Sequence, residues 1–295
     1  MTMSNRKFWA LLGVLGWMLS GLNASAQSTE SVPLAQVLHV HGIAVDRSDP
    51  SRLYLATHYG LFLATSDGMA RRISRARDDF MGFTLGASDP AVFFASGHPS
   101  TGGNLGVIVS TDGGQTWAQI ATGVRGPVDF HQMDASKADA AVIYGVYGGM
   151  QVSRDGGKTW VVAGPAPDGL IAIAAGAKDA NTLYAATQNG LQASRDGGQT
   201  WQAAYLLKRR VSMVHVASNG TVYAYVVGTG LIESREGDIS WKTLGRLQDD
   251  NVMLHFAVGS GRLYATTQRN DILLSEDGGQ TWEPYGNSSR RSQKP

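Results

Sequence analysis

Histidine and methionine are the residue types in this chain best suited to chemistry, and they occur together in short segments. The first segment is residues 38–42, where His39 and His41 flank Val40. On a β-strand, side chains at positions i and i+2 point to the same face. We therefore expect the two imidazoles to lie side by side. Such a pair on an otherwise apolar strand indicates a binding site.

Similar segments recur at residues 79–82, 129–133, 213–215 and 253–255. Each carries histidine, methionine or both. Two further histidines, His58 and His98, fall at the ends of neighbouring predicted strands, where they would bind the same ligand or shape the rim of its site. The full set of candidate ligands is His39, His41, His58, Met81, His98, His131, Met133, Met213, His215, Met253 and His255.

Imidazole and thioether donors together favour copper(I). The chain has no cysteine, so a soft metal ion must use methionine or histidine. Zinc is typically bound by cysteine, histidine and carboxylates, whereas calcium and magnesium prefer oxygen. The pattern therefore predicts a His/Met pocket for copper(I), with silver as a chemical analogue. A competing interpretation is that the histidines hydrogen-bond in a polar channel and the methionines fill gaps in the core.

The principal ligands expected from this pattern are His39, His41 and His131, followed by Met81. Asp79 and Asp129 stand two residues before Met81 and His131, on the same predicted strand face. They would orient a ligand as supporting carboxylates.

A repeated motif predicts the elements that position these residues. Residues 110–117 read Ser-Thr-Asp-Gly-Gly-Gln-Thr-Trp, and the pattern returns at 153–160, 194–201 and 275–282. Degraded copies lie at 65–68 and 234–241. The aspartate and glycines suit a tight turn between two strands, and the tryptophan suits packing on a neighbouring sheet. A period of about 40 residues is typical of a four-stranded propeller blade.

We predict an all-β fold, a single six-bladed β-propeller over residues 27–287. Seven blades are the alternative, which the length disfavours. The first strand of each blade would line the central channel and bring the candidate ligands to one mouth, opposite the turns of the repeated motif. The fourth blade, beginning near Leu170, supplies no ligand, so a metal ion would sit off-centre. Residues 31–37 are a candidate for an additional strand of the last blade.

The repeated motif resembles the Asp-box, or BNR repeat, of sialidases and many other propellers. Several short sequence segments together resemble those of a family of exported bacterial BNR-repeat proteins labelled glycosyl hydrolase-like or sialidase-like. These segments are His39-Val40-His41-Gly42, Ala56-Thr57-His58-Tyr59-Gly60, Asp79-Phe80-Met81-Gly82-Phe83, Ser96-Gly97-His98-Pro99 and Asp129-Phe130-His131. A more distant likeness is to photosystem assembly propellers. Both resemblances imply a fold and leave the chemistry open.

A glycosyl hydrolase-like or carbohydrate-binding propeller is the second hypothesis. In the sialidase family, members carry an arginine triad and an Arg-Ile-Pro motif. This chain resembles that motif only at Arg72-Ile73-Ser74. Another glycosidase would need two carboxylates across a cleft. The candidates near the histidine-rich mouth are Asp78, Asp79, Asp129, Asp249 and Asp250. A scaffold that holds another exported protein is the third hypothesis.

The ends of the chain predict export. Residues 1–26 resemble a signal peptide, with Arg6 and Lys7 before an apolar run and Ala24-Ser25-Ala26 at the cleavage site. The run is short for a membrane anchor, so we expect no membrane span after cleavage and a periplasmic or secreted protein in copper homeostasis or resistance. Residues 288–295 read as a flexible basic tail. With 25 basic and 24 acidic residues, the chain shows no charge signature for nucleic acid.

Overall fold

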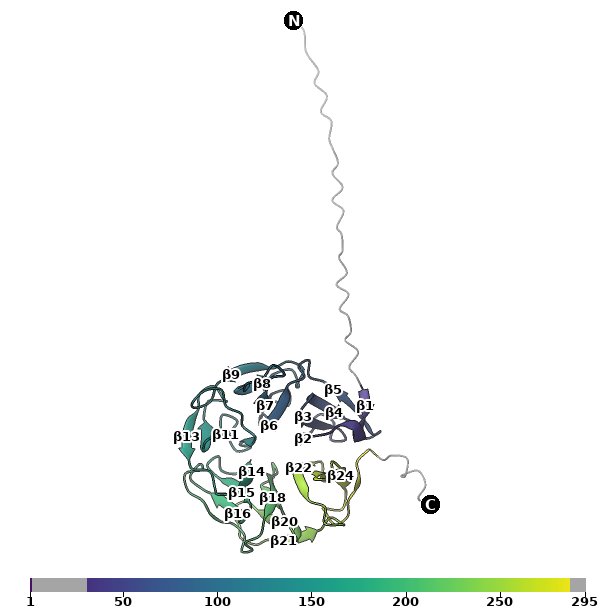
Figure 1. Ribbon diagram of the computed structural model, residues 1–295, viewed down its shortest axis with the longest axis vertical. Helices are drawn as coiled ribbons and strands as arrows, with labels where there is room; N and C mark the ends of the chain where they lie inside the picture. The colour runs from purple at the N-terminus through teal and green to yellow at the C-terminus, as the bar shows by residue number, and fades with distance from the viewer. Residues whose placement is uncertain (2–30, 287–295) are drawn as a thin grey trace.

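Six antiparallel sheets stand around a central axis in the computed structural model of this chain (Figure 1). The structure describes residue 1 and residues 31–286. The predicted signal peptide and basic tail lie outside the described residues, apart from residue 1. The prediction of a six-bladed all-β propeller is confirmed. No helix in the described part of the chain is long and apolar enough to span a membrane.

Each blade contains four strands in sequence order, numbered from the channel outward, and the first blade has one more. The first blade contains β2 (Val40–Val45), β3 (Leu53–Thr57), β4 (Gly60–Ala64) and β5 (Met69–Arg72), with β1 (Ser31–Pro33) outside β5 and a 3-10 turn at Leu34–Gln36. The second contains β6 (Asp79–Leu85), β7 (Phe93–His98), β8 (Val107–Ser110) and β9 (Ala118–Ala121). The third contains β10 (Met133–Ala135), β11 (Ile143–Val146), β12 (Met150–Ser153) and β13 (Val161–Gly164).

The remaining three blades follow the same plan. The fourth contains β14 (Leu170–Ala175), β15 (Leu183–Thr187), β16 (Gly190–Ser194) and β17 (Gln202–Ala203). The fifth contains β18 (Val211–Val216), β19 (Thr221–Val226), β20 (Gly230–Arg235) and β21 (Lys242–Gly245). The sixth contains β22 (Met253–Gly259), β23 (Arg262–Thr267), β24 (Ile272–Ser275) and β25 (Glu283–Pro284). The first strand of each blade contacts the first strands of its neighbours around the channel.

The core is divided into clusters of buried side chains, each shared by two adjacent blades. Between the second and third blades, for example, Phe94 packs in one cluster with Phe130, Ile143 and Trp160. Equivalent clusters join the other neighbours, including the last blade and the first. A twisted sheet with two apolar faces needs such a neighbour on each side, and the closed ring supplies both.

The repeated motif is a structural turn, as predicted. In its second full copy, Asp155 accepts hydrogen bonds from the hydroxyls of Ser153 (2.8 Å) and Thr159 (2.6 Å) and from two backbone amides. The Thr159 hydroxyl is the largest cause that lowers the pKa of Asp155 to about 2. The Trp160 indole donates to the carbonyl of Gly157 at 2.8 Å. These local hydrogen bonds use the acceptor sites of the Asp155 carboxylate. The motif therefore stabilises a turn and does not present a free carboxylate to a ligand.

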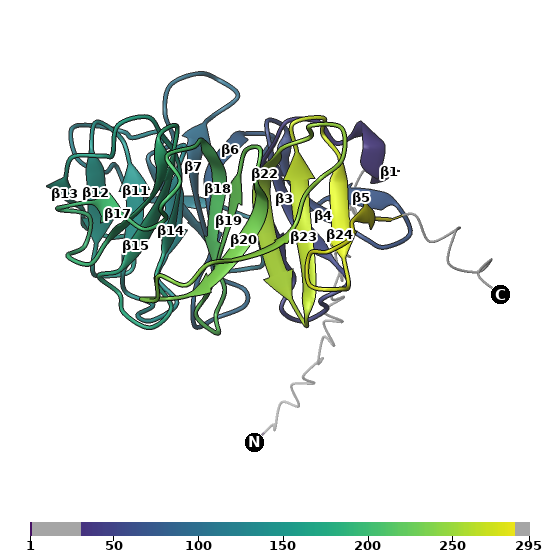
Figure 2. The same ribbon diagram turned by 90° about the horizontal axis from the view of Figure 1, so that it is seen from below.

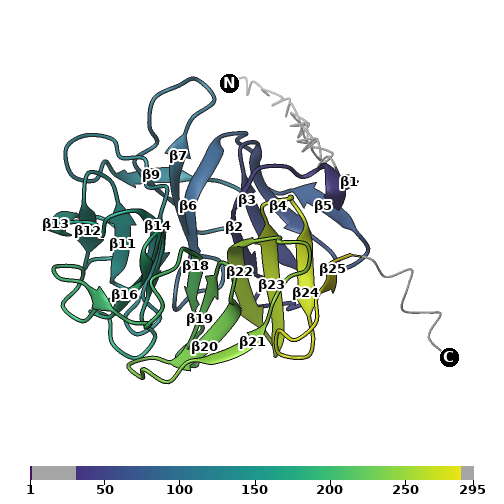
Figure 3. The same ribbon diagram turned by 60° about the horizontal axis from the view of Figure 1, so that its bottom comes forward.

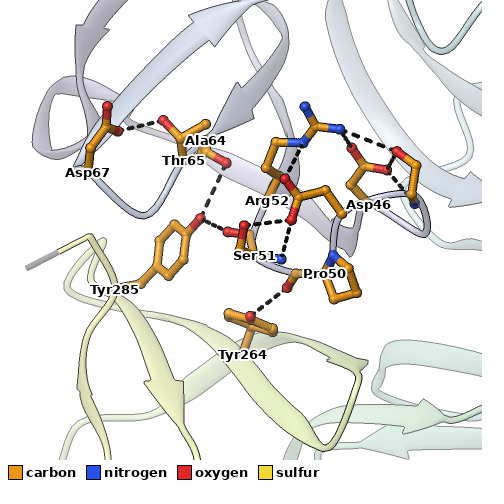
Figure 4. A network of polar contacts seen from close by, with 11 residues as sticks. Asp46, Pro50, Ser51, Arg52, Ala64, Thr65, Asp67, Tyr264 and Tyr285 are labelled. Carbon is orange, nitrogen blue, oxygen red and sulfur yellow. Dashed lines mark hydrogen bonds and ion pairs between the residues drawn. The ribbon is translucent and has the colours of Figure 1, made fainter. Parts of the chain in front are cut away.

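The ring closes through side chains, and the expected extra strand on the last blade is wrong. Residues 31–33 pair with β5 in the first blade, with Ser31 opposite Arg71. The last blade already has its own fourth strand, β25, so it offers no vacant place. Instead, Tyr264 of β23 donates a hydrogen bond to the Pro50 carbonyl at 2.8 Å, and Tyr285 donates to that of Ser51 at 2.6 Å (Figure 4).

Tyr285 provides a test of this closure, because it is buried in the cluster between the last and first blades. We expect Tyr285→Phe to lower the free energy of unfolding by about 1 kcal/mol through the lost hydrogen bond. Tyr285→Ala should lower it by about 3–5 kcal/mol, because it also leaves a cavity. Urea unfolding measures both changes. Tyr147→Phe, at a half-exposed tyrosine far from the closure, is the control and should change stability by less than about 0.5 kcal/mol. Equal small effects at all three would contradict the account.

Candidate functional site

The first strands of the six blades all run in one direction, so their starts meet at one mouth of the channel (Figure 3). This mouth faces upward in Figure 2, where the loop after β7 projects from it. His41 lies near the start of β2, and Asp79 begins β6. His58 and His98 come to the same mouth at the ends of β3 and β7, because second strands are antiparallel to first strands. The predicted convergence of the first three blades is therefore present.

One histidine–aspartate trio joins the first and second blades. The ligand-capable atoms of His41, His58 and Asp79 lie within 4.8 Å of one another. His58 Nδ1 is 2.6 Å from Asp79 Oδ2, and His41 Nε2 is 3.6 Å from Asp79 Oδ1. All three side chains are half-buried. The ring centroids of His41 and His58 are 4.3 Å apart.

Two buried atoms of this trio face each other across a gap too long for a hydrogen bond. His41 Nε2 and Asp79 Oδ1 are buried, face one another, and have no hydrogen-bond partner among the described residues. Leaving a buried polar atom unsatisfied costs about 1–3 kcal/mol, and more for a charged group. A cation between the imidazole nitrogen and the carboxylate oxygen would satisfy both atoms.

His39 reaches the trio by a different route from the one predicted. Strand β2 begins at Val40, and its pairing with β3 shifts register between Val40 and Gly42. His39 has a φ of 56°, a left-handed conformation that is uncommon for residues other than glycine. The alternation rule therefore does not apply to His39 and His41. The backbone turn nevertheless brings the His39 ring to 5.0 Å from that of His58, so His39 and His41 both lie against His58.

A second trio joins the second and third blades. His98 Nε2 is 2.9 Å from Asp129 Oδ2, and His131 Nε2 is 2.5 Å from the same oxygen. Asp129 Oδ1 is buried without a hydrogen-bond partner among the described residues. The carbonyl of Gly103 lies 2.9 Å from His98 Nδ1, an arrangement that holds the proton on Nδ1 and directs Nε2 to the carboxylate.

The two trios are neighbours, because Asp79 and His98 face each other across the pairing of β6 and β7. The pKa values of their histidines shift in opposite directions. Burial lowers the pKa of His41, and the opposing effect of Asp79 is smaller. The hydrogen bond with the Gly103 carbonyl, together with Asp129, raises the pKa of His98. His41 is therefore neutral at pH 7, the form in which imidazole binds a metal ion.

His215 and His255 lie deeper, on the wall of a central channel of about 450 Å³ that His41 and His131 also line. Burial lowers the pKa of His215 to about 3 and that of His255 to about 4. Both imidazoles are neutral at physiological pH. The channel wall therefore carries neutral nitrogen donors inward from the mouth.

Most of the predicted methionine ligands are core residues. Met133 packs between the second and third blades, and Met213 and Met253 pack together between the fifth and sixth. Met133 and Met213 also line the central channel. Met81 is also buried, two residues after Asp79 in β6. The described residues thus gather imidazole and carboxylate at the mouth, and Asp79 and Asp129 stand inside the trios as full members.

A protein-family model described as BNR/Asp-box repeat matches residues 108–119, 151–161 and 192–203. The chain is a BNR-repeat β-propeller. Solved structures of similar fold include the GH74 enzyme of Niastella koreensis, with 15% identity and a TM-score of 0.62, and the GH74 xyloglucanase of Xanthomonas campestris, with 17% identity and a TM-score of 0.59. These alignments cover 83% and 87% of this chain. The chain spans less than half the length of either enzyme, 45% and 46%.

A structure described as YCF48 bound to D1 peptide is also similar, with 15% identity and a TM-score of 0.56. That alignment covers 88% of this chain and 87% of the other. At these identities the likenesses show a shared fold and leave the chemistry to the site itself. No curated protein matches the sequence of this chain.

The buried channel histidines predict acid sensitivity. Below about pH 6.5 the unfolded chain protonates both residues, while folded His255 and His215 stay neutral until about pH 4 and 3. The free energy of unfolding should therefore decrease as the pH is lowered from about 6.5 to 4, by about 1.4 kcal/mol per pH unit for each histidine. Urea unfolding at several pH values with a chelator measures this slope.

The double variant His215→Gln/His255→Gln should flatten the slope. His98→Gln is the matched control. The raised pKa of His98 stabilises the folded state at low pH, so its loss should not flatten the profile. A wild-type profile that is flat between pH 6.5 and 4 would contradict the assignment.

Proposed function

We propose that this propeller binds a transition-metal ion at its histidine-rich mouth, and that the ion is copper. The observation that carries the proposal is the pair of buried, unpartnered atoms, His41 Nε2 and Asp79 Oδ1, 3.6 Å apart and facing each other. Ligand atoms about 3.3 Å apart surround a tetrahedral ion with bonds of about 2.0–2.1 Å. The pair is therefore close to the separation that a bound ion would impose.

The donor types narrow the choice of ion. The first trio offers two imidazoles and a carboxylate, with a third imidazole, His39, against His58. Nitrogen and oxygen donors suit copper(II) and zinc, and copper(II) binds most sites of this kind more tightly than the other divalent first-row ions. The thioethers that favour copper(I) belong mostly to core clusters, and Met133 and Met213, which also line the channel, are not members of either trio. We therefore propose copper(II) as the principal ion, with zinc as its competitor.

The first trio is the primary site in this proposal. Its three members are half-buried, whereas His131 in the second trio is exposed. The first trio also holds two unpartnered atoms that face each other, His41 Nε2 and Asp79 Oδ1, whereas the second trio holds one, Asp129 Oδ1. The predicted signal peptide would deliver the protein to the periplasm or beyond, where a copper-binding propeller would serve copper homeostasis or resistance.

The two other hypotheses have less specific support. A glycosidase needs one carboxyl group free to donate a proton, but Asp79 and Asp129 both bind histidines. The GH74 enzymes share only the fold with this chain. A scaffold role is supported only by an equally distant fold similarity to the peptide-bound YCF48 structure. Neither hypothesis explains the unpartnered atoms.

Competition titrations with copper(II), copper(I) and zinc test the proposal. We expect wild-type protein to bind copper(II) most tightly. His41→Ala/His58→Ala should weaken this binding at least 100-fold, because it removes two of the three ligands. Asp79→Asn should weaken it about 10- to 100-fold. Binding should also weaken as the pH falls, because protons compete for the imidazoles.

The matched control is His98→Ala/His131→Ala, which removes two histidines of the same mouth but leaves the first trio intact. It should retain the tightest copper(II) site. Circular dichroism of each variant confirms that the propeller is folded. Wild-type protein that binds none of the three ions, or equal binding by both double variants, would refute the proposed site.

A further inference from the structure

The opposite mouth of the channel carries a second cavity, separate from the histidine trios. It is formed by loops that follow the first strands of four blades, and its volume is about 370 Å³. Its polar lining consists of Arg47, Ser48, Ser88, Lys137 and Ser218. Two side chains are basic, three carry hydroxyls, and no acidic residue of the described chain lines the cavity.

Arg47 is held in a fixed position without a counter-ion. Its Nη1 donates a hydrogen bond to the Gly86 carbonyl at 2.6 Å, and the Ala87 carbonyl lies 3.4 Å away. These bonds tie the first blade to the second. Within residues 31–286, no carboxylate forms an ion pair with Arg47. The residue as a whole is exposed, and partial burial of the guanidinium lowers its pKa.

Two acidic residues next to cavity residues are already paired with other cations. Asp46, the residue before Arg47, pairs with Arg52 at 2.7 Å and accepts the Ser48 hydroxyl. Asp134 pairs with Lys137 at 2.7 Å. The positive charge of Arg47 therefore remains uncompensated in the cavity. Lys137 has three ammonium protons, and its bond to Asp134 uses one of them.

We propose that this cavity is a binding site for a small oxyanion, a carboxylate or phosphate group held by Arg47 and Lys137. Guanidinium groups suit both anions, because their planar N–H fork matches two oxygens at once. The hydroxyls of Ser88 and Ser218 supply further donors. Arg47, Lys137 and Ser218 also line the central channel. The anion site and the histidine trios therefore lie at the two ends of one channel.

Calorimetric titration of metal-free protein with inorganic phosphate, and separately with succinate, tests the site. We expect saturable binding that weakens with added salt. Arg47→Gln should reduce the affinity at least tenfold. Ser218→Glu leaves Arg47 in place but puts a competing carboxylate in the cavity, so it should abolish binding even if Arg47→Gln proves unstable. The tighter of the two probes identifies the group as phosphate or carboxylate.

The control is Arg154→Gln, which removes an exposed arginine in a turn of the same face, where it binds Asn181. Its anion affinity should match that of the wild type. Both cavity variants should keep wild-type copper binding, because the trios are at the far mouth. No saturable binding of either probe, or unchanged affinity in both cavity variants, would overturn the proposal.

Discussion

The structure depends on the burial of both faces of every sheet against a neighbouring blade. No blade could bury its side chains alone, so the ring must close. Closure falls to the contact between the last blade and the first, where Tyr264 and Tyr285 reach across to the carbonyls of Pro50 and Ser51. A closed ring with equivalent blades also fixes the direction of all six inner strands. Their starts share one mouth and their ends share the other.

This constraint explains how ionisable groups come together at low exposure. The inner strands place imidazoles and carboxylates around a narrow opening, where the surrounding blades remove part of their hydration. The pKa shifts of the histidines differ between the mouth and the interior of the channel. At the rim, the hydrogen bond with the Gly103 carbonyl, together with Asp129, raises the pKa of His98. Farther in, burial dominates and His215 and His255 stay neutral. Neutral nitrogen donors beside an unsatisfied carboxylate oxygen are what a metal ion requires.

The sequence was a reliable guide wherever one structural unit repeats. The period of the Asp-box copies predicted the six blades, and the inner position of each first strand followed from it. The sequence did not predict local backbone conformation. Nothing in the pattern around His39 signalled a positive φ, and the register shift at Val40 breaks the alternation on which that prediction relied. The fate of Met133, Met213 and Met253 depended on which sheet face meets the next blade, which is a property of packing. Antiparallel pairing was enough to place the ends of β3 and β7, and so His58 and His98, at the mouth where the first strands begin. Their contacts with Asp79 and Asp129 cross between blades and depend on how the blades pack.

The central claim is that the first trio coordinates copper, and the most direct measurement is anomalous X-ray diffraction at the copper absorption edge from crystals of the copper-loaded protein. The account predicts a single dominant peak between His41 Nε2, His58 and Asp79, with nitrogen and oxygen as the ligand atoms. A peak ligated mainly by methionine sulfur, a peak elsewhere on the molecule, or no ordered copper at this mouth would contradict it.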